Sequence, residues 1–219
     1  VLRTAAATAV AAKYLARPDA SVAAIVGCGV QGRVQLRALA CVRPIRTVYA
    51  HDTAPEVARR FAEDLAPRLG IDIEAVTDLG AATRRSDVVI TCTPSRHPIL
   101  GSADVAPGTF VAAVGADSEE KQEIEPQFLA SSAVVVDVLE QCATFGDLHH
   151  ALAAGVMRRE DVRAELGQVV AGVKPSRLSD DETIVFDSTG TALQDVAAAA
   201  VVYERARERK VGQMVDLGS

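Results

Sequence analysis

The stretch VAAIVGCGVQG, residues 22–32, decides the fold of this chain. A short apolar, β-branched run predicts a strand over Ser21–Val26, and the glycines that follow end it. Helical spacing resumes at once and predicts a helix over Val30–Ala40. A Gly-x-Gly-x-x-Gly turn between a strand and a helix is typical of a Rossmann dinucleotide-binding unit.

Each position in this turn has a physical role in such a unit. Gly27 permits the tight turn, Gly29 lets the backbone approach a pyrophosphate, and Gly32 lets the helix pack closely on the strand. Val30 and Gln31 open the helix, whose first amides are expected to face the phosphates. The alternative is a glycine-rich turn in another kind of α/β fold.

Asp52 lies twenty residues after Gly32, at the end of the next predicted strand. A carboxylate at this position would accept hydrogen bonds from the adenosine ribose and repel a 2′-phosphate. The sequence therefore favours NAD over NADP. Arg59 and Arg60 follow on the next helix, where they are expected to be solvated rather than to bind a phosphate.

The rest of the chain alternates strands with helices, which predicts an α/β fold with a Rossmann-like, doubly wound parallel sheet. Further strands are expected over Ile45–Ala50, Asp72–Val76, Asp87–Thr91, Phe110–Val114, Ala133–Val138 and Thr183–Asp187. Helices are expected over Val1–Ala16, Glu56–Leu69, Leu79–Arg84, Ile124–Ala130, Gly146–Ala154, Glu165–Ala171 and Ala192–Arg209.

These elements suggest three parts. Residues 18–190 form the Rossmann domain, residues 1–17 form a helix that leads into it, and residues 191–219 form a helix and tail that leave it. The first and last helices are expected to pair in space. Because the chain opens without Met and directly in a helix, we expect a preceding segment; the two terminal helices would then belong to a partly missing substrate and dimerisation domain.

Composition excludes several classes of protein. The 219 residues carry a net charge of −6, only 4% are aromatic, and no Lys/Arg run occurs, which argues against nucleic-acid binding. The four cysteines show no CxxC pair, so neither a zinc site nor a disulfide framework is predicted. No apolar run approaches the ~20 residues of a membrane span, and no signal peptide is visible, which indicates a cytoplasmic protein.

Several stretches together resemble the ornithine cyclodeaminase/μ-crystallin family. They are Leu2–Ala6, Gly27–Gly32, Thr91–Arg96, Val114–Asp117, Val136–Asp137, Leu139–Gln141, Glu165–Gly167, Phe186–Gly190 and Leu193–Val196. The ornithine-type members typically have Gly-Gly-Asp where this chain has Gly115-Ala116-Asp117, followed by Lys121-Gln122-Glu123. In this respect the chain is more similar to the archaeal-type alanine dehydrogenase branch.

The resemblance implies roles for particular residues. Arg3 would hold the α-carboxylate of a substrate, and Thr4 would lie beside the cofactor phosphates. Asp117 would handle the proton on the reacting nitrogen. The alternatives are that Arg3 is a solvated charge at a helix end and that Asp117 caps a loop. Two further groups would face the cofactor: Thr93, Pro94 and Ser95 after the fourth strand, and Ser188, Thr189 and Gly190 before the last helix.

Three functions remain open from the sequence. The first is an NAD-dependent oxidoreductase acting on the C–N bond of a small α-amino or α-imino acid, of the alanine dehydrogenase or imine reductase type. The second is an ornithine-type cyclodeaminase that uses NAD without consuming it, and the third is a non-catalytic, crystallin-like dinucleotide-binding protein. The apolar face of Ala192–Val202 and the opening helix are expected to pack against the missing segment or a second subunit, and a homodimer is expected. His149-His150 is interpreted as a surface pair rather than an acid–base pair.

Overall fold

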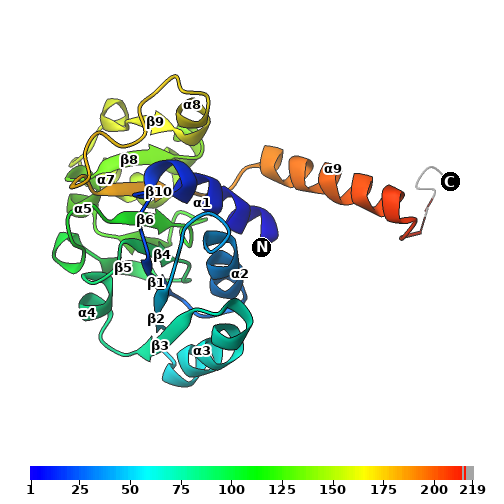
Figure 1. Cartoon of the computed structure of the whole chain (residues 1–219). Coiled ribbons are helices and arrows are strands. Elements are labelled where there is room, and N and C mark those ends of the chain that lie inside the picture. Colours follow the sequence, from blue (N-terminus) through cyan, green and yellow to red (C-terminus); the bar gives the residue numbers. More distant parts are fainter. Residues whose placement is uncertain (214, 216–219) are drawn as a thin grey trace.

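Eight parallel strands form the central sheet of the computed structural model, which describes residues 1–213 and 215 (Figure 1). Their order is β3-β2-β1-β4-β6-β10-β8-β9. The strands are β1 (Val22–Val26), β2 (Thr47–His51), β3 (Asp72–Val76), β4 (Val88–Thr91), β6 (Phe110–Ala113), β8 (Ala133–Val136), β9 (Ala164–Glu165) and β10 (Ile184–Asp187). Every neighbouring pair is parallel, so the predicted sheet type is confirmed.

Helices cover both faces of this sheet. The helices are α1 (Leu2–Leu15), α2 (Val30–Leu39), α3 (Pro55–Leu69), α4 (Leu79–Thr83), α5 (Pro126–Ala130), α6 (Leu139–Phe145), α7 (Asp147–Ala153), α8 (Leu166–Val170) and α9 (Ala192–Arg209). Side chains of β1 alternate between two cores: Ile25 packs with α1, α2, α3 and α8, whereas Val26 packs with α4, α5, α6 and α7. Strands buried on both faces explain why β1 and β4 are apolar without interruption.

The strand order reverses at β1, which lies between β2 and β4. From β1 the chain winds outward through β2 to β3 and then crosses back to β4. At such a reversal the loops that follow the two central strands turn in opposite directions and leave a crevice at the carboxyl edge of the sheet. The turn after β1 begins at Gly27, and the segment after β4 begins at Cys92. The fold therefore places the glycine motif and Thr93-Pro94-Ser95 at one crevice.

The structure differs from the sequence-based elements in several places. β5 (Arg96–Leu100) and β7 (Gln122–Ile124) form a second, two-stranded sheet that the sequence did not predict. The helix expected from Ile124 begins only at Pro126, because Ile124 belongs to β7 and proline is well suited to a first helical position. α6 was missed, and β2 is displaced by one or two residues from Ile45–Ala50, because Thr47 is the residue that pairs with Val22.

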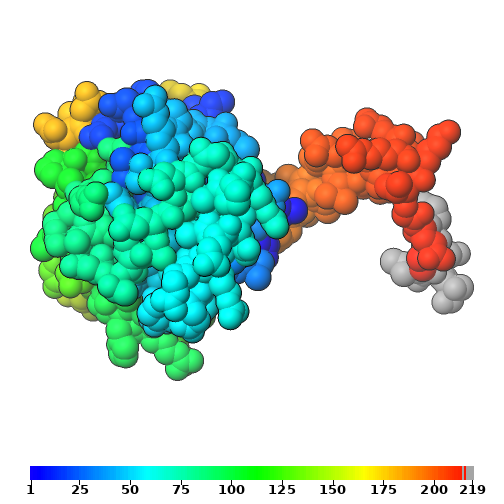
Figure 2. All heavy atoms as spheres, turned by 60° about the horizontal axis from the view of Figure 1, so that its bottom comes forward, coloured from blue at the N-terminus to red at the C-terminus, as the bar shows by residue number. Residues whose placement is uncertain are grey.

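α9 stands away from the rest of the molecule, as Figures 1 and 2 both show. Thr191 caps its start by accepting a hydrogen bond from the Gln194 amide, and Arg207 and Arg209 suit the negative end of its dipole. None of its residues is buried. The expected pairing of the first and last helices is therefore limited to their first turns, where Arg3 contacts Asp195; beyond them α9 has no core to pack against.

Candidate functional site

The glycine turn is shaped by close backbone packing. Gly27 has a φ of +96°, and a Cβ there would lie 2.9 Å from the Cys92 carbonyl oxygen. A Cβ at Gly32 would lie only 2.1 Å from the Gly27 carbonyl oxygen. At Gly29, by contrast, an added Cβ would meet no protein atom within 4 Å. The fold itself thus requires Gly27 and Gly32, whereas the open side of Gly29 leaves room for a ligand to approach the backbone.

The start of α2 is suited to an anion. Gly29 is its N-cap and provides no capping side chain, so the first amides, at Val30, Gln31 and Gly32, are available to a ligand. The Val30 side chain is 70% exposed and lies at the mouth of this turn. The amides of Val30, Gln31 and Gly32 are the hydrogen-bond donors that a pyrophosphate needs.

Asp52 follows β2 at the same edge of the sheet. Its Oδ2 accepts a hydrogen bond from the Cys28 amide at 2.9 Å, and its Oδ1 accepts one from the Ala54 amide at 3.0 Å. Both oxygens are thereby fixed, yet a carboxylate offers about four acceptor positions and two remain. Asp52 lines a cavity of about 370 Å³ together with Gly27, Gly29, Thr93, Pro94 and Ser95.

A second cavity of about 310 Å³ lies farther along the carboxyl edge, beside the start of α1. It brings together eight of the predicted site residues: Arg3, Thr4, Gln31, Thr93, Pro94, Asp117, Ser188 and Thr189. Cys92, Thr93 and Pro94 line both cavities, so the two adjoin. Together they form one groove from Asp52 to Asp117. Gly32 and Gly190 line neither cavity and act through packing.

Arg3 is positioned by the beginning of α9. Its Nε donates to the Asp195 Oδ1 at 3.0 Å, and its guanidinium lies against Gly190. Gly190 has a φ of +82°, and a Cβ there would overlap the guanidinium. Its Nη1 also donates to the Gln194 Oε1 at 3.5 Å. A guanidinium held in this way can bind a carboxylate with two parallel hydrogen bonds.

Asp117 follows β6 and lines the same cavity as Arg3. Its Oδ1 accepts a hydrogen bond from the Lys121 ammonium at 2.5 Å, and 58% of its side chain is exposed. Lys121 also lines the cavity, and the sequence analysis did not assign it a role. The site thus contains a carboxylate with an ammonium as its direct partner.

His149 and His150 line neither cavity; each has a ring nitrogen within hydrogen-bond distance of a main-chain carbonyl.

The turn before α9 is held by a carboxylate that the sequence did not single out. Asp137 Oδ2 accepts hydrogen bonds from the Ser188 hydroxyl at 2.9 Å and the Gly190 amide at 2.7 Å. The Gln141 amide group donates to the Thr189 hydroxyl oxygen at 2.9 Å. Both residues lie in stretches on which the family resemblance rests. Their contacts fix the wall of the groove opposite Thr93.

Three fully buried carboxyl groups lie behind the groove. They are Glu123, Asp147 and Asp187, none of which was predicted as a site residue. Burial raises the pKa of each of them, and hydrogen bonds oppose the rise. Asp187 Oδ2 accepts a hydrogen bond from the Leu148 amide at 2.9 Å, while its Oδ1 and the Asp147 Oδ2 have no protein partner among the described residues. Asp147 and Asp187 therefore favour sharing a proton over carrying two charges.

We expect this pair to make stability depend on pH. Burial raises the pKa of Asp187 to about 7 in the folded protein, whereas an unfolded Asp titrates near 4. The protonated Asp187 side chain thus stabilises the folded state fully below the pKa of unfolded Asp, and this stabilisation is lost as the pH rises through about 7. Thermal unfolding should show a Tm roughly 2–8 °C lower at pH 8 than at pH 5, with a smaller decrease in Asp187→Asn. An equal decrease in the variant would contradict this assignment.

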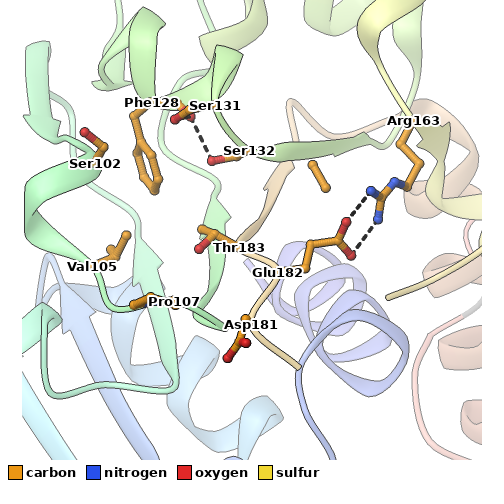
Figure 3. Close-up of a pocket in the computed structure, with 11 residues that line it drawn as sticks. Ser102, Val105, Pro107, Phe128, Ser131, Ser132, Arg163, Asp181, Glu182 and Thr183 are labelled. Carbon is orange, nitrogen blue, oxygen red and sulfur yellow. Dashed lines mark hydrogen bonds and ion pairs between the residues drawn. The ribbon is translucent and has the colours of Figure 1, made fainter. Parts of the chain in front are cut away.

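A third cavity, about 570 Å³, lies at the opposite edge of the sheet (Figure 3). It lies where β8 and β10 begin and is lined by Ala133 and Thr183. Two of its charged groups pair with each other, because Arg163 binds Glu182 through both carboxylate oxygens. Its serines 131 and 132 donate to the Phe128 carbonyl oxygen. This cavity lies at the amino ends of the strands, away from the glycine turn, so it is not the candidate site.

Within residues 1–213 and 215, no group of three or more His, Cys, Asp or Glu side chains is arranged to hold a metal ion. In the same part of the chain, no helix has the length and apolar character to cross a bilayer.

Burial raises the pKa of Cys28 to about 12 and that of Cys92 well above its usual value, so both thiols stay neutral.

Comparison with known proteins gives consistent matches along the chain. The model of the ornithine cyclodeaminase/mu-crystallin family matches residues 1–210. Alanine dehydrogenase of Archaeoglobus fulgidus is 44% identical over 214 residues, which cover 98% of this chain and 66% of that protein. The chain therefore spans slightly less than two thirds of that relative's length.

Two solved structures superpose closely on this chain. The Δ1-pyrroline-2-carboxylate reductase of Thermococcus litoralis, in complex with NADH and L-proline, matches with a TM-score of 0.94 and 37% identity, over 97% of this chain and 66% of that one. An archaeal alanine dehydrogenase dimer with bound NAD matches with a TM-score of 0.93 and 42% identity, over 98% of this chain and 66% of that one.

Proposed function

Because the chain belongs to the ornithine cyclodeaminase/mu-crystallin family, we propose that its protein is an NAD-dependent oxidoreductase acting on the C–N bond of a small α-amino or α-imino acid. The observation that carries this proposal is the continuous groove that joins Asp52, the glycine turn, Thr93 and the pair Arg3 and Asp117. Relatives described as an alanine dehydrogenase and an imino-acid reductase support it.

The residues of the groove fit a nicotinamide dinucleotide. Asp52 would bind the adenosine ribose, the α2 amides the pyrophosphate, and Thr93 to Ser95 the ribose on the nicotinamide side. Thr4 and the turn from Ser188 to Gly190 would close the groove from the other side. When bound there, NAD supplies the acceptor or donor of a hydride. The open side of Gly29 is the observation that favours this fit.

The chain's own residues would orient the substrate and manage its proton. Arg3 would bind the α-carboxylate, which fixes one end of the substrate. Asp117 would take the proton from the amine, because an amino acid loses a hydride from Cα readily only when its nitrogen is neutral. Lys121 would hold the Asp117 carboxylate in place through their ion pair. In the reductive direction the same proton returns from Asp117 to nitrogen.

A turnover assay tests this function. The protein as its gene encodes it would be assayed with NADH in two separate reactions. One contains pyruvate and ammonia, and the other contains Δ1-pyrroline-2-carboxylate. We expect NADH oxidation with at least one of them. Failure to turn over any of these substrates, with NADH bound, would contradict the proposal and leave the cyclodeaminase and the non-catalytic dinucleotide-binding protein, which an assay with L-ornithine would separate.

We expect a preference for NAD(H) that depends on Asp52. Its carboxylate repels a 2′-phosphate and accepts hydrogen bonds from the ribose hydroxyls. In calorimetric titrations NADH should bind more tightly than NADPH. Asp52→Ala should reduce the ratio of the Kd for NADPH to the Kd for NADH by about tenfold. The control is Asp64→Ala, which removes a carboxylate from the exposed face of α3. Tighter binding of NADPH by the unmodified protein would refute the cofactor assignment.

We also propose that α1 and α9 belong to a substrate and dimerisation domain and that the protein is a homodimer. The side chains of Leu193, Val196, Val202 and Tyr203 on α9 are all more than half exposed. An apolar helix surface of this kind usually packs on a partner. Light scattering after gel filtration should give the mass of a dimer for the protein as encoded, and association or poor solubility for the 219-residue chain alone. A stable, active monomer of this chain would contradict the proposal.

A further inference from the structure

Glu123 lies in β7, directly behind the groove, and none of its surface is exposed. Its Oε1 accepts hydrogen bonds from the Thr93 amide at 2.6 Å and from the Thr93 hydroxyl at 2.7 Å. Its Oε2 accepts from the Thr91 hydroxyl at 2.7 Å and from the Gly115 amide at 2.9 Å. Four donors occupy the acceptor positions of one carboxylate, which is how its burial is compensated.

These hydrogen bonds join two separate segments of the groove. Thr91 and Thr93 belong to β4 and the loop after it, whereas Gly115 follows β6 and lies two residues before Asp117. The segments approach closely: a Cβ at Gly115 would lie 2.4 Å from the Thr93 carbonyl oxygen and 2.6 Å from Glu123. Glu123 itself lines neither cavity. It therefore acts on the groove only through the residues that it holds.

Glu123 is in turn fixed from behind. Asp147, at the start of α7, accepts hydrogen bonds from the Glu123 and Ile124 amides at 2.8 and 2.9 Å. The neighbouring Leu148 amide donates to Asp187 at the end of β10. The side chains of Glu123, Asp147 and Asp187 thus link the C-terminal ends of β4, β6 and β10 through hydrogen bonds that involve β7 and α7. The backbone of Glu123 has little freedom to follow a change in its side chain.

We propose that Glu123 is a positioning residue that sets the distance between Thr93 and Asp117. If the proposed function holds, on which this inference rests, Thr93 contacts the cofactor and Asp117 the substrate nitrogen. The separation of the two segments then sets the placement of one reactant relative to the other. Displacement of reacting groups by about 1 Å can lower a rate on the order of 10²-fold.

Glu123→Gln tests the proposal, because neither orientation of the amide can replace the carboxylate. Each oxygen of Glu123 accepts one backbone N–H, from Thr93 or from Gly115. A threonine hydroxyl can turn and accept a hydrogen bond, but a backbone N–H can only donate. The NH2 of glutamine therefore faces a backbone donor in either orientation. The two segments must move apart to relieve this.

The variant would be studied in the protein as its gene encodes it. We expect NADH to bind about tenfold more weakly in a fluorescence titration and kcat to fall about tenfold or more. The deuterium isotope effect on kcat, measured with NADH labelled at the transferred position, should rise. A purely structural role would lower Tm and the folded fraction but leave the Kd and isotope effect of folded molecules unchanged. The matched control is Glu119→Gln, which removes an exposed carboxylate four residues earlier and should stay within about twofold of wild type.

The outcomes separate this inference from the proposed function. A wild-type protein that binds NADH without turnover refutes the proposed function, while the Kd values of Glu123→Gln and Glu119→Gln still test the positioning role. A folded Glu123→Gln variant with the Kd of its control overturns the inference. If Glu123→Gln does not fold, Thr91→Val decides: it removes one donor at a fully buried residue outside both cavities. Its Kd for NADH should rise about threefold, and an unchanged Kd overturns the inference.

Discussion

Replacement of Asp117 by Asn, in the protein as its gene encodes it, should lower kcat by about 10²–10⁴-fold and leave the affinity for NADH nearly unchanged. Asparagine has almost the same shape as aspartate but cannot accept the proton of the substrate amine. It also weakens the interaction with the Lys121 ammonium, which lies 2.5 Å from the carboxylate. Steady-state kinetics and a separate NADH titration would distinguish the loss of chemistry from a loss of binding.

Two comparisons sharpen this test. Glu119→Gln removes a carboxylate from the same loop and should leave kcat within about twofold of wild type. Lys121→Met keeps the Asp117 carboxylate but removes its partner, so it should be less damaging than Asp117→Asn. Near-normal kcat in Asp117→Asn would show that Asp117 only caps its loop and that the proton takes another route.

Arg3→Ala should mainly raise KM for the amino acid, by roughly 10–100-fold, because a hydrogen bond to a charged group contributes about 1.5–3 kcal/mol. Arg3 binds the substrate carboxylate equally in the ground state and the transition state, so kcat should change less than KM. The Asp195 Oδ1, 3.0 Å from the Arg3 Nε, already holds the guanidinium in position, which favours binding without reorganisation.

Arg3→Lys is the informative comparison. Lysine keeps the charge but lacks the fork that binds both carboxylate oxygens, so its KM should lie between those of wild type and Arg3→Ala. Asp195→Asn should raise KM slightly, because it loosens the guanidinium without removing it. If KM in Arg3→Ala equals that of wild type, Arg3 is a solvated charge at the end of α1 and the carboxylate is bound elsewhere.

The central fold follows directly from local sequence. The apolar run of β1 follows from burial of the strand on both faces, and Gly27 and Gly32 follow from close backbone packing. Alternating strands and helices then imply a parallel sheet, and a parallel sheet places the carboxyl ends of its strands together. The proximity of Thr93, Asp117 and Ser188 in one cavity could be anticipated on that basis alone.

Other features depend on contacts that no local pattern reveals. β5 and β7 are short strands without clear alternation, and they pair with each other rather than with the main sheet. Glu123 looks like an ordinary charged residue in the sequence. Its burial becomes intelligible only when Thr91, Thr93 and Gly115 converge on it in space. The family resemblance included Asp137, but only the structure shows that its carboxylate holds the Ser188–Gly190 turn.

The ratio of NADH consumed to amino acid formed, measured under steady state with the protein as its gene encodes it, tests the central claim most directly. Transfer of one hydride to the Cα of an imino acid predicts one NADH oxidised for each amino acid released. Absence of NADH oxidation with imino acids, together with ammonia release from L-ornithine without net change in NADH, would contradict the claim, because it would show that the hydride returns to the cofactor as in a cyclodeaminase.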